Sequence, residues 1–305
     1  MSSSSERIAW LNEQYSPSRT AHDFNGSIES YKAGTDAARA AITGKRHRVL
    51  AYGAPPSNRI ECFLPRTEGA PGEAVRGALR RGAPIFAFLH GGWWQDLSIE
   101  YAAAPAVALT DAGAIYASIG YTLTPAVGLR EIVAEVSAAL STIAAIANVM
   151  GGDPRRIVLS GHSAGAHLAA TQLTALAPEA PRYTAAGLLL IGGAYDLGPI
   201  AESYVNEKVR MSAADADALS PALLTPLHDV PVKVRVGEEE PEEFHRNAAL
   251  LLERWTPSLS AIDSATLNGR DHFDVLDELA DPHGRLYADA LELLGIPLQR
   301  VAVGR

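Results

Sequence analysis

The sequence changes pattern abruptly across residues 157–165, which read Ile157-Val158-Leu159-Ser160-Gly161-His162-Ser163-Ala164-Gly165. The apolar run at the start is typical of a buried strand, and the alanine-rich run from Ala164 to Ala177 is typical of a helix. A serine between a strand and a helix lies on a sharp turn that exposes its hydroxyl, and small flanking residues let neighbouring backbone approach closely. Residues 161–165 therefore form a nucleophile motif and predict an α/β-hydrolase fold.

Strand and helix patterns alternate along most of the chain. Short apolar runs predict strands at residues 49–52, 59–64, 85–89, 114–119, 156–160, 186–191, 232–236 and 264–267. Helical periodicity covers residues 30–41, 99–111, 129–150, 242–255 and 273–294, and residues 66–82 are expected to form a surface loop. Apolar strands that alternate with helices predict a mostly parallel central sheet covered by helices on both faces.

Length and composition favour one large domain. With 305 residues, of which 47% are hydrophobic and 20% charged, the chain can bury a full core. We expect a single domain over residues 1–305, with a polar N-terminal segment at 1–45 and an insertion near the active site at 196–230. Cys62 is the only cysteine, so no intrachain disulfide can form, and its thiol is expected to be packed and inert.

Charge and hydropathy narrow the range of partners. The formal net charge of −9 argues against nucleic acids and anionic membranes. The start of the chain lacks the basic and apolar regions of a signal peptide, and no apolar run approaches the roughly 20 residues of a membrane span. We therefore expect a cytoplasmic protein that acts on a small molecule. A homodimer is expected only from the general frequency of dimers.

A serine nucleophile needs a base and an orienting carboxylate, and in this fold class they follow the serine in the order acid, then histidine. His272 comes directly after the last predicted strand and is the predicted base. The predicted strand at 232–236 is followed by Glu238, Glu239 and Glu240, any of which could supply the acid. Asp196, which follows the preceding strand, is the main competitor.

The oxyanion hole is expected to consist of backbone N–H groups. One follows the nucleophile at Ala164, and Gly92 and Trp93 of the loop His90-Gly91-Gly92-Trp93 supply the others. Trp93 and Trp94 could line an aromatic-binding pocket or could pack beneath the loop. The sequence contains no metal-ligand spacing, no phosphate-binding loop and no dinucleotide motif, so neither a cofactor nor a metal is predicted.

Several segments resemble the serine-dependent kynurenine formamidases (arylformamidases), relatives of the hormone-sensitive-lipase-like esterases. They are Asn12-Glu13-Gln14-Tyr15-Ser16-Pro17-Ser18-Arg19, His90-Gly91-Gly92-Trp93-Trp94-Gln95, Gly161 to Ala166, Ala194-Tyr195-Asp196-Leu197, Tyr204-Val205-Asn206, Leu219-Ser220-Pro221, Val236-Gly237 with Glu243-Phe244-His245, and Asp271-His272-Phe273. The resemblance implies an α/β-hydrolase fold, a Ser–acid–His triad, no cofactor, and hydrolysis of N-formyl-kynurenine to kynurenine and formate. It assigns the nucleophile to Ser163, the base to His272 and the acid to Glu240, where the family usually has Asp.

Further residues are expected to contact the substrate, and two other functions stay open. We expect substrate contacts from His90, Gly91, Trp94, His162 and Tyr195. Glu240 in place of Asp, and Trp93 where Tyr is common, are also compatible with a carboxylesterase for short-chain or aryl esters, against which a preference for formamides would count. A hydrolase fold that only binds a partner is the third hypothesis, and failure of Ser163 to react with a fluorophosphonate probe would favour it.

Overall fold

The computed structural model describes residues 4–66, 82–177, 183 and 185–298 of the chain. Its centre is an eight-stranded sheet in the order β1-β2-β4-β3-β5-β6-β7-β8. The strands are β1 His47–Ala51, β2 Arg59–Phe63, β3 Ala83–Leu89, β4 Ile115–Ile119, β5 Gly152–His162, β6 Ala185–Ile191, β7 Val232–Gly237 and β8 Ile262–Leu267. β2 is antiparallel to both of its neighbours, and every pair from β4 to β8 is parallel. The predicted mostly parallel sheet is confirmed.

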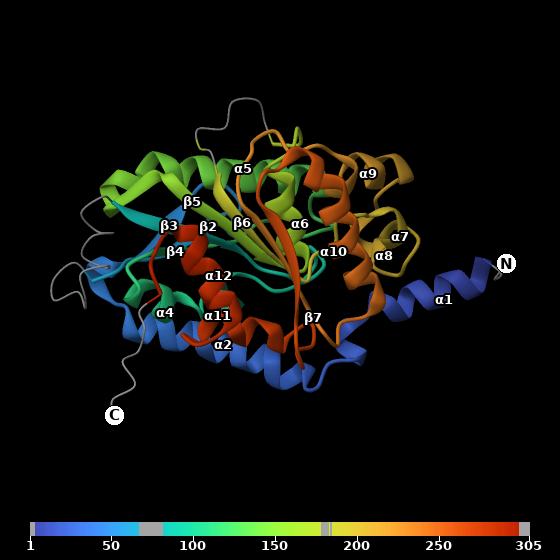
Figure 1. The fold of residues 1–305 in the computed structure, drawn as a ribbon, viewed down its shortest axis with the longest axis horizontal. Coiled ribbons are helices and arrows are strands. Elements are labelled where there is room, and N and C mark those ends of the chain that lie inside the picture. Colours follow the sequence, from blue (N-terminus) through green and yellow to red (C-terminus); the bar gives the residue numbers. More distant parts are fainter. Residues whose placement is uncertain (1–3, 67–81, 178–182, 184, 299–305) are drawn as a thin grey trace.

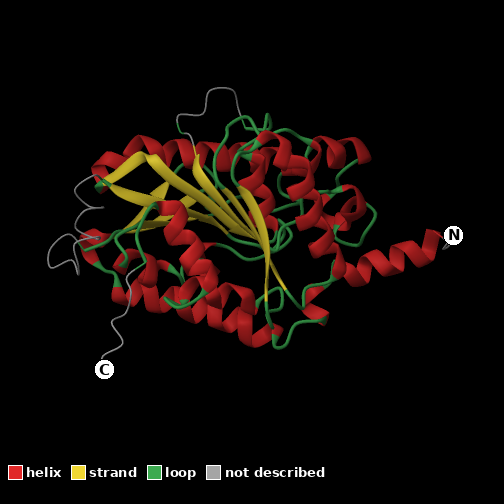
Figure 2. Cartoon of the chain, viewed as in Figure 1, coloured by secondary structure: helices red, strands yellow, loops and turns green. Residues whose placement is uncertain are grey.

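Helices cover both faces of this sheet (Figures 1 and 2). One face carries α5 Leu129–Ile146, α6 Ala164–Thr171 and α10 Glu242–Trp255, and the other carries α2 Phe24–Ala41, α4 Ala106–Asp111, α11 Asp277–Ala280 and α12 Arg285–Leu294. Alternate side chains of β3 enter the two cores, since Ile85 and Leu89 belong to the first and Phe86 and Phe88 to the second. Every residue of β3 is therefore buried, which explains its unbroken apolar sequence.

Two long helices expected from periodicity are interrupted. The stretch 99–111 forms a 3-10 turn, Ile99–Tyr101, and then α4, which begins after Pro105 because a proline interrupts the helical hydrogen-bond ladder. The stretch 273–294 divides into a 3-10 turn at Asp274–Leu276, α11 and α12, with Pro282 and Gly284 between the last two. Residues 102–105 and 281–284 therefore lie outside helices, where the sequence predicted continuous ones.

The N-terminal 45 residues hold more helix than the one expected at 30–41. α1 Ser4–Gln14 is mostly exposed and projects from the body of the protein (Figure 1). α2 begins at Phe24 because the side chain of Asp23 accepts a hydrogen bond from the N–H of Gly26 and caps the helix. Most of the loop expected at 66–82 lies outside the described residues.

Residues 196–230, predicted to be an insertion, form short helices between β6 and β7. They are α7 Gly198–Ala201, α8 Asn206–Val209 and α9 Ala213–Ala218, followed by the 3-10 turn Pro221–Leu223.

The single cysteine, Cys62 of β2, is buried, and burial raises the pKa of its thiol to about 12. A thiol that stays protonated at neutral pH is a poor nucleophile, as expected for a packed cysteine.

Among the residues that the structure describes, one helix is apolar enough to span a membrane by length and composition alone, which differs from the expectation that no such run exists. It is Leu129–Met150, with a mean hydropathy of 1.7. Half of its apolar window is buried inside the protein, and Ile132, Val136 and Leu140 lie in the core beneath the sheet. In this fold the helix packs as a core element.

A buried ion pair joins β7 to α12, and we expect its loss to be costly. The fully buried Arg235 guanidinium donates from Nε to Asp289 Oδ2 at 2.6 Å and from Nη1 to Asp263 Oδ1 at 2.5 Å. Replacing Asp289 by alanine leaves part of a buried charge uncompensated, so the free energy of unfolding should fall by about 3–5 kcal/mol. Urea unfolding of the variant measures this. Asp281→Ala, on an exposed turn, is the control, and equal stability of the two variants would contradict the prediction.

Candidate active site

Ser163 stands at the junction between β5 and α6, with φ 55° and ψ −120°. A side chain is rarely held at positive φ, and such strain is common at catalytic nucleophiles. The two glycines of the motif are required by contact distances. A Cβ atom at Gly161 would lie 2.2 Å from the carbonyl oxygen of Gly165, and one at Gly165 would lie 2.0 Å from that of Leu89. The turn therefore closes only with hydrogen at both positions.

His272 and Glu240 form a buried pair beside this turn. His272 Nδ1 donates to Glu240 Oε2 at 2.5 Å, and the other carboxylate oxygen accepts the N–H of Gly237 at 2.7 Å. A Cβ atom at Gly192 would lie 3.0 Å from each of these oxygens and 3.1 Å from His272 Nδ1, so glycine at the end of β6 makes room for the pair. Because Nδ1 carries the proton shared with Glu240, Nε2 is left free to act as a base.

The neighbouring carboxylates that were candidates for the acid have other partners. Glu238 accepts the N–H of Gly269 at 2.7 Å, and Glu239 contacts the ring of His22 at 2.7 Å. Asp196 accepts from Arg246 Nη1 at 2.9 Å. Among these four carboxylates, the structure brings only Glu240 to His272.

The loop between β3 and the 3-10 turn at 99–101 holds the predicted oxyanion donors in a strained conformation. Trp93, Trp94 and Leu97 have φ values of 50°, 59° and 66°, and Gly92 has a φ of 103°. The N–H groups of Gln95 and Asp96 both donate to the carbonyl oxygen of Gly92, and no partner is found among the described residues for the N–H groups of Gly92, Trp93 and Ala164. Unpaired N–H groups next to Ser163 can receive an oxyanion.

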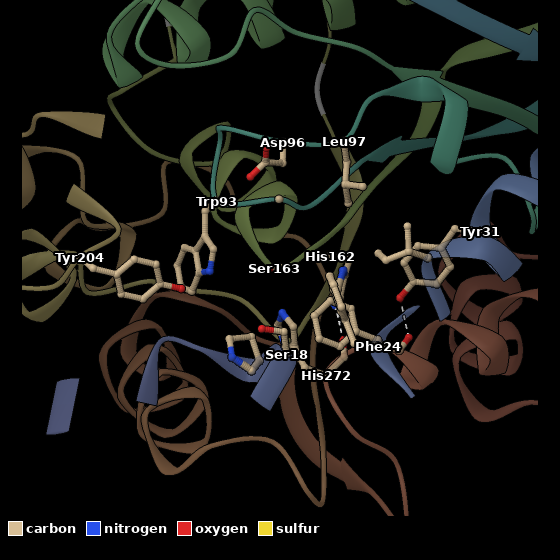
Figure 3. Close-up of a pocket in the computed structure, with 14 residues that line it drawn as sticks. Ser18, Phe24, Tyr31, Trp93, Asp96, Leu97, His162, Ser163, Tyr204 and His272 are labelled. Carbon is tan, nitrogen blue, oxygen red and sulfur yellow. Dashed lines mark hydrogen bonds between the residues drawn. The ribbon is translucent and has the colours of Figure 1, made fainter. Parts of the chain in front are cut away.

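A pocket of about 300 Å³ opens at this site (Figure 3). Its lining is mostly apolar and aromatic and consists of Pro17, Ser18, Phe24, Ile28, Tyr31, Gly92, Trp93, Asp96, Leu97, His162, Ser163, Tyr204, His272 and Phe273. The nucleophile, the base and two oxyanion residues thus share one cavity. Sequence reasoning missed its walls at Phe24, Tyr31 and Asp96, which carry no motif of their own, although Ser18 and Tyr204 lie in segments that carried the resemblance.

Four residues expected to touch the substrate lie behind the pocket wall instead. Trp94 and Tyr195 are fully buried, because the strained loop turns Trp94 toward His167 and the backbone N–H of Tyr195 is held by Asn247. His90 is buried against Tyr121 and Gly91 against the backbone of His162, so neither reaches the cavity. Of the five residues expected at the substrate, only His162 lines the pocket.

Two buried histidines support the catalytic loops in their neutral form. Burial and the neighbouring His272 hold the pKa of His162 well below its usual value, and its Nε2 donates to the backbone oxygen of His272 at 2.7 Å. Burial also lowers the pKa of His90 to about 4, and its Nδ1 donates to the oxygen of Gly91 at 2.8 Å. A neutral ring that donates one hydrogen bond fixes the backbone without adding charge beside the base.

The N-terminal segment fastens the loop that carries His272. Tyr31 of α2 donates from its hydroxyl to the backbone oxygen of Phe273 at 2.6 Å, and Phe24 packs edge-on against Phe273 with centroids 4.9 Å apart. The N–H of His22 donates to Asp271 Oδ2 at 2.6 Å. Residues 17–31 therefore build one wall of the pocket and position the base.

The ring of His22 contacts Glu239 at 2.7 Å and Asp274 at 3.1 Å, and Asp271 lies 3.6 Å away. His22, Asp271 and Asp274 also have the spacing of a possible metal-binding group, but their atoms already bond to one another. Hydrogen bonds to Glu239 and Asp274 raise the pKa of this exposed ring above its usual value. A raised pKa means that the two carboxylates bind the protonated ring more tightly than the neutral one, so protonation of His22 strengthens its hold on the N-terminal segment.

This contact predicts a pH-dependent stability. A raised pKa in the folded state gives a contribution that is complete below the unfolded pKa of about 6.5 and is lost as pH rises through the folded value. The melting temperature of His22→Ala should therefore lie further below that of the wild type at pH 6 than at pH 9. His228→Ala, at an exposed histidine with no ring contact among the described interactions, is the control. A His22→Ala deficit that does not change with pH would contradict the prediction.

Comparison with known proteins defines the class. Residues 86–239 match the alpha/beta hydrolase fold family, and the chain belongs to that family. The kynurenine formamidases of Salmo salar and Danio rerio are each 27% identical to it over 93% of this chain and 96% of their own length. The protein is a hydrolase of this family, as the sequence predicted.

Solved structures resemble more than nine-tenths of the chain. One is a crystal structure from Silicibacter that is titled a thioesterase. It is 29% identical in sequence, the alignment covers 91% of this chain and 97% of the other, and the TM-score is 0.78. The thermostable carboxylesterase EstE1 from a metagenomic library is 20% identical over 97% of this chain and 98% of its own, with a TM-score of 0.69. At that identity the second likeness concerns the fold alone.

Proposed function

We propose that the protein is a serine hydrolase that removes a formyl group from an aromatic amide of the N-formyl-kynurenine type, with Ser163 as nucleophile, His272 as base and Glu240 as acid. The observation that carries the proposal is the hydrogen bond between His272 and Glu240, beside a pocket that Ser163 and His272 both line. The likeness to two kynurenine formamidases along nearly the whole chain supports the formamide as substrate.

In this mechanism His272 Nε2 takes the proton of the Ser163 hydroxyl as the oxygen attacks the formyl carbon. The N–H groups of Gly92, Trp93 and Ala164 stabilise the tetrahedral oxyanion, and one such donor is worth about 10²–10³ in rate. His272 then passes the proton to the aniline nitrogen, the C–N bond breaks, and the amine leaves. Water, deprotonated by the same ring, releases formate from the formyl-enzyme.

Glu240 acts on His272 rather than on the substrate. Its Oε2 accepts the Nδ1 proton, which fixes the tautomer that leaves Nε2 basic, and its charge stabilises the imidazolium that forms during attack. The hydrogen bond from Gly237 to Oε1 fixes the carboxylate in turn. The extra methylene of Glu relative to Asp is accommodated because Gly192 leaves space beside the pair.

The deciding experiment compares kcat/KM for N-formyl-L-kynurenine with values for p-nitrophenyl acetate and p-nitrophenyl butyrate on the purified protein. We expect a formamide value of about 10⁴ M⁻¹s⁻¹ or more, well above both esters. Fast ester hydrolysis with negligible formamide turnover would overturn the formamidase proposal.

That outcome would favour the second candidate, a carboxylesterase for short-chain or aryl esters. Trp93 supports this alternative, because it lines the pocket where a smaller ring is usual in the formamidases that the sequence resembles. A cytoplasmic location, a small-molecule substrate without nucleic acid or membrane partners, and a homodimeric state stay predictions.

A further inference from the structure

The described lining of the pocket includes one carboxylate and no permanently positive side chain. Asp96 is the one carboxylate that lines it, and no lysine or arginine is found among its described lining residues. Of the two histidines in the lining, His162 is kept neutral by burial, which holds its pKa well below the usual value. The permanent charge that a bound molecule meets is therefore negative.

The backbone of Asp96 is fixed to the oxyanion loop. Its N–H donates to the carbonyl oxygen of Gly92 at 2.9 Å, and a Cβ atom at Gly92 would lie only 2.2 Å from the backbone oxygen of Asp96. The preceding residue, Gln95, ties the loop to the 196–230 segment through a 2.7 Å bond from Nε2 to the oxygen of Val205. Asp96 thus has a fixed backbone position relative to the oxyanion donors.

The side chain of Asp96 makes no stabilising contact with the described part of the fold. It is exposed, and no hydrogen bond or ion pair to it is found among the described residues. Figure 3 shows it beside Trp93, across the pocket from Ser18, Phe24 and His272. In the same view Trp93 lies between Asp96 and Tyr204, and aromatic faces attract cations.

We propose that Asp96 is a specificity-determining residue that binds a protonated amine on the leaving group, so that the preferred substrates are aryl amides with an ammonium-bearing side chain. This inference rests on the proposed function. A formyl group is too small to fill a cavity of about 300 Å³, so the aromatic leaving group and its side chain occupy it. A carboxylate on that side chain meets no cation there and lowers the rate.

The test uses four substrates that share a 2-formamidophenyl ketone and differ in the side chain, which ends in a methyl group, an amine, an amino acid or a carboxylic acid. We expect kcat/KM to be highest for the substrate that ends in an amine, lower for the amino acid, lower again for the methyl compound and lowest for the carboxylic acid. A charge-assisted hydrogen bond in a solvated pocket predicts an amine-to-methyl ratio of about 10. Asp96→Asn should reduce that ratio to near one, whereas Glu253→Gln, which removes one exposed charge far along α10, should leave it unchanged.

Product binding separates this inference from the proposed function. The four deformylated ketones are titrated into the wild-type protein and into Asp96→Asn by calorimetry, which needs no turnover. We expect the amine product to bind about 10-fold more tightly than the methyl product, and the difference to vanish in Asp96→Asn. If formamides are not hydrolysed but this difference is found, the chemistry proposed for the site is wrong and Asp96 still selects amines. Equal affinities, or tighter binding of the acid, would overturn the role of Asp96.

Discussion

Replacing Ser163 by alanine is expected to lower kcat by about 10⁴- to 10⁶-fold for whichever substrate proves best. Without the hydroxyl no acyl-enzyme can form, and only binding and the oxyanion donors remain to assist attack by water. Steady-state kinetics with the purified variant measures the loss, and mass spectrometry after treatment with a fluorophosphonate should show a labelled wild type and an unlabelled variant.

Ser160→Ala is the matched control for this experiment. Ser160 lies three positions earlier, within β5, is fully buried, and its hydroxyl finds no hydrogen-bond partner in the described part of the chain. Removal of that hydroxyl should leave kcat within a few-fold of the wild type. Turnover by Ser163→Ala at a rate close to that of Ser160→Ala would exclude the acyl-enzyme mechanism.

Replacing Glu240 by glutamine should reduce kcat by about 10⁴-fold, because an amide can neither select the required tautomer of His272 nor stabilise its positive charge. The side chain keeps its size, and its oxygen can still accept the N–H of Gly237, so the fold should persist. Circular dichroism and the melting temperature check the fold, and steady-state kinetics measures the rate.

Glu238→Gln is the control on the same loop, since its amide oxygen can still accept from Gly269. It should retain nearly full activity. Glu240→Asp, which withdraws the carboxylate by one methylene, should fall between the wild type and Glu240→Gln. Equal activity of Glu240→Gln and Glu238→Gln would mean that another carboxylate orients the base.

The sequence was sufficient for the features that depend on local pattern. The nucleophile turn follows from two glycines around Ser163 at the end of an apolar strand, and the buried strands follow from unbroken apolar runs. The choice among Glu238, Glu239 and Glu240 could not be made in this way. Each of the three has a different partner, and those partners come from a turn after β8, the N-terminal segment and the base loop.

The substrate residues show the same limit. A side chain near the nucleophile in sequence, such as Trp94, was expected in the pocket, but the positive φ of the loop directs it into the core. Phe24 and Tyr204, far away in sequence, reach the pocket because α2 and the 196–230 segment fold over the carboxyl end of the sheet. Periodicity reports which face of an element is buried, but not which distant elements meet.

The strained loop at residues 92–97 also constrains which substitutions the sequence can accept during evolution. Three non-glycine residues there hold left-handed backbone conformations, each at a cost of about 1–2 kcal/mol. A lineage selected only for heat tolerance could relieve this strain by placing glycine or asparagine at Trp93 or Leu97, whereas loss of the fully buried Trp94 side chain would cost more than the relief. Such a substitution at Trp93 would also remove part of the cavity wall. Selection for thermal stability and selection for substrate preference therefore act on the same residues.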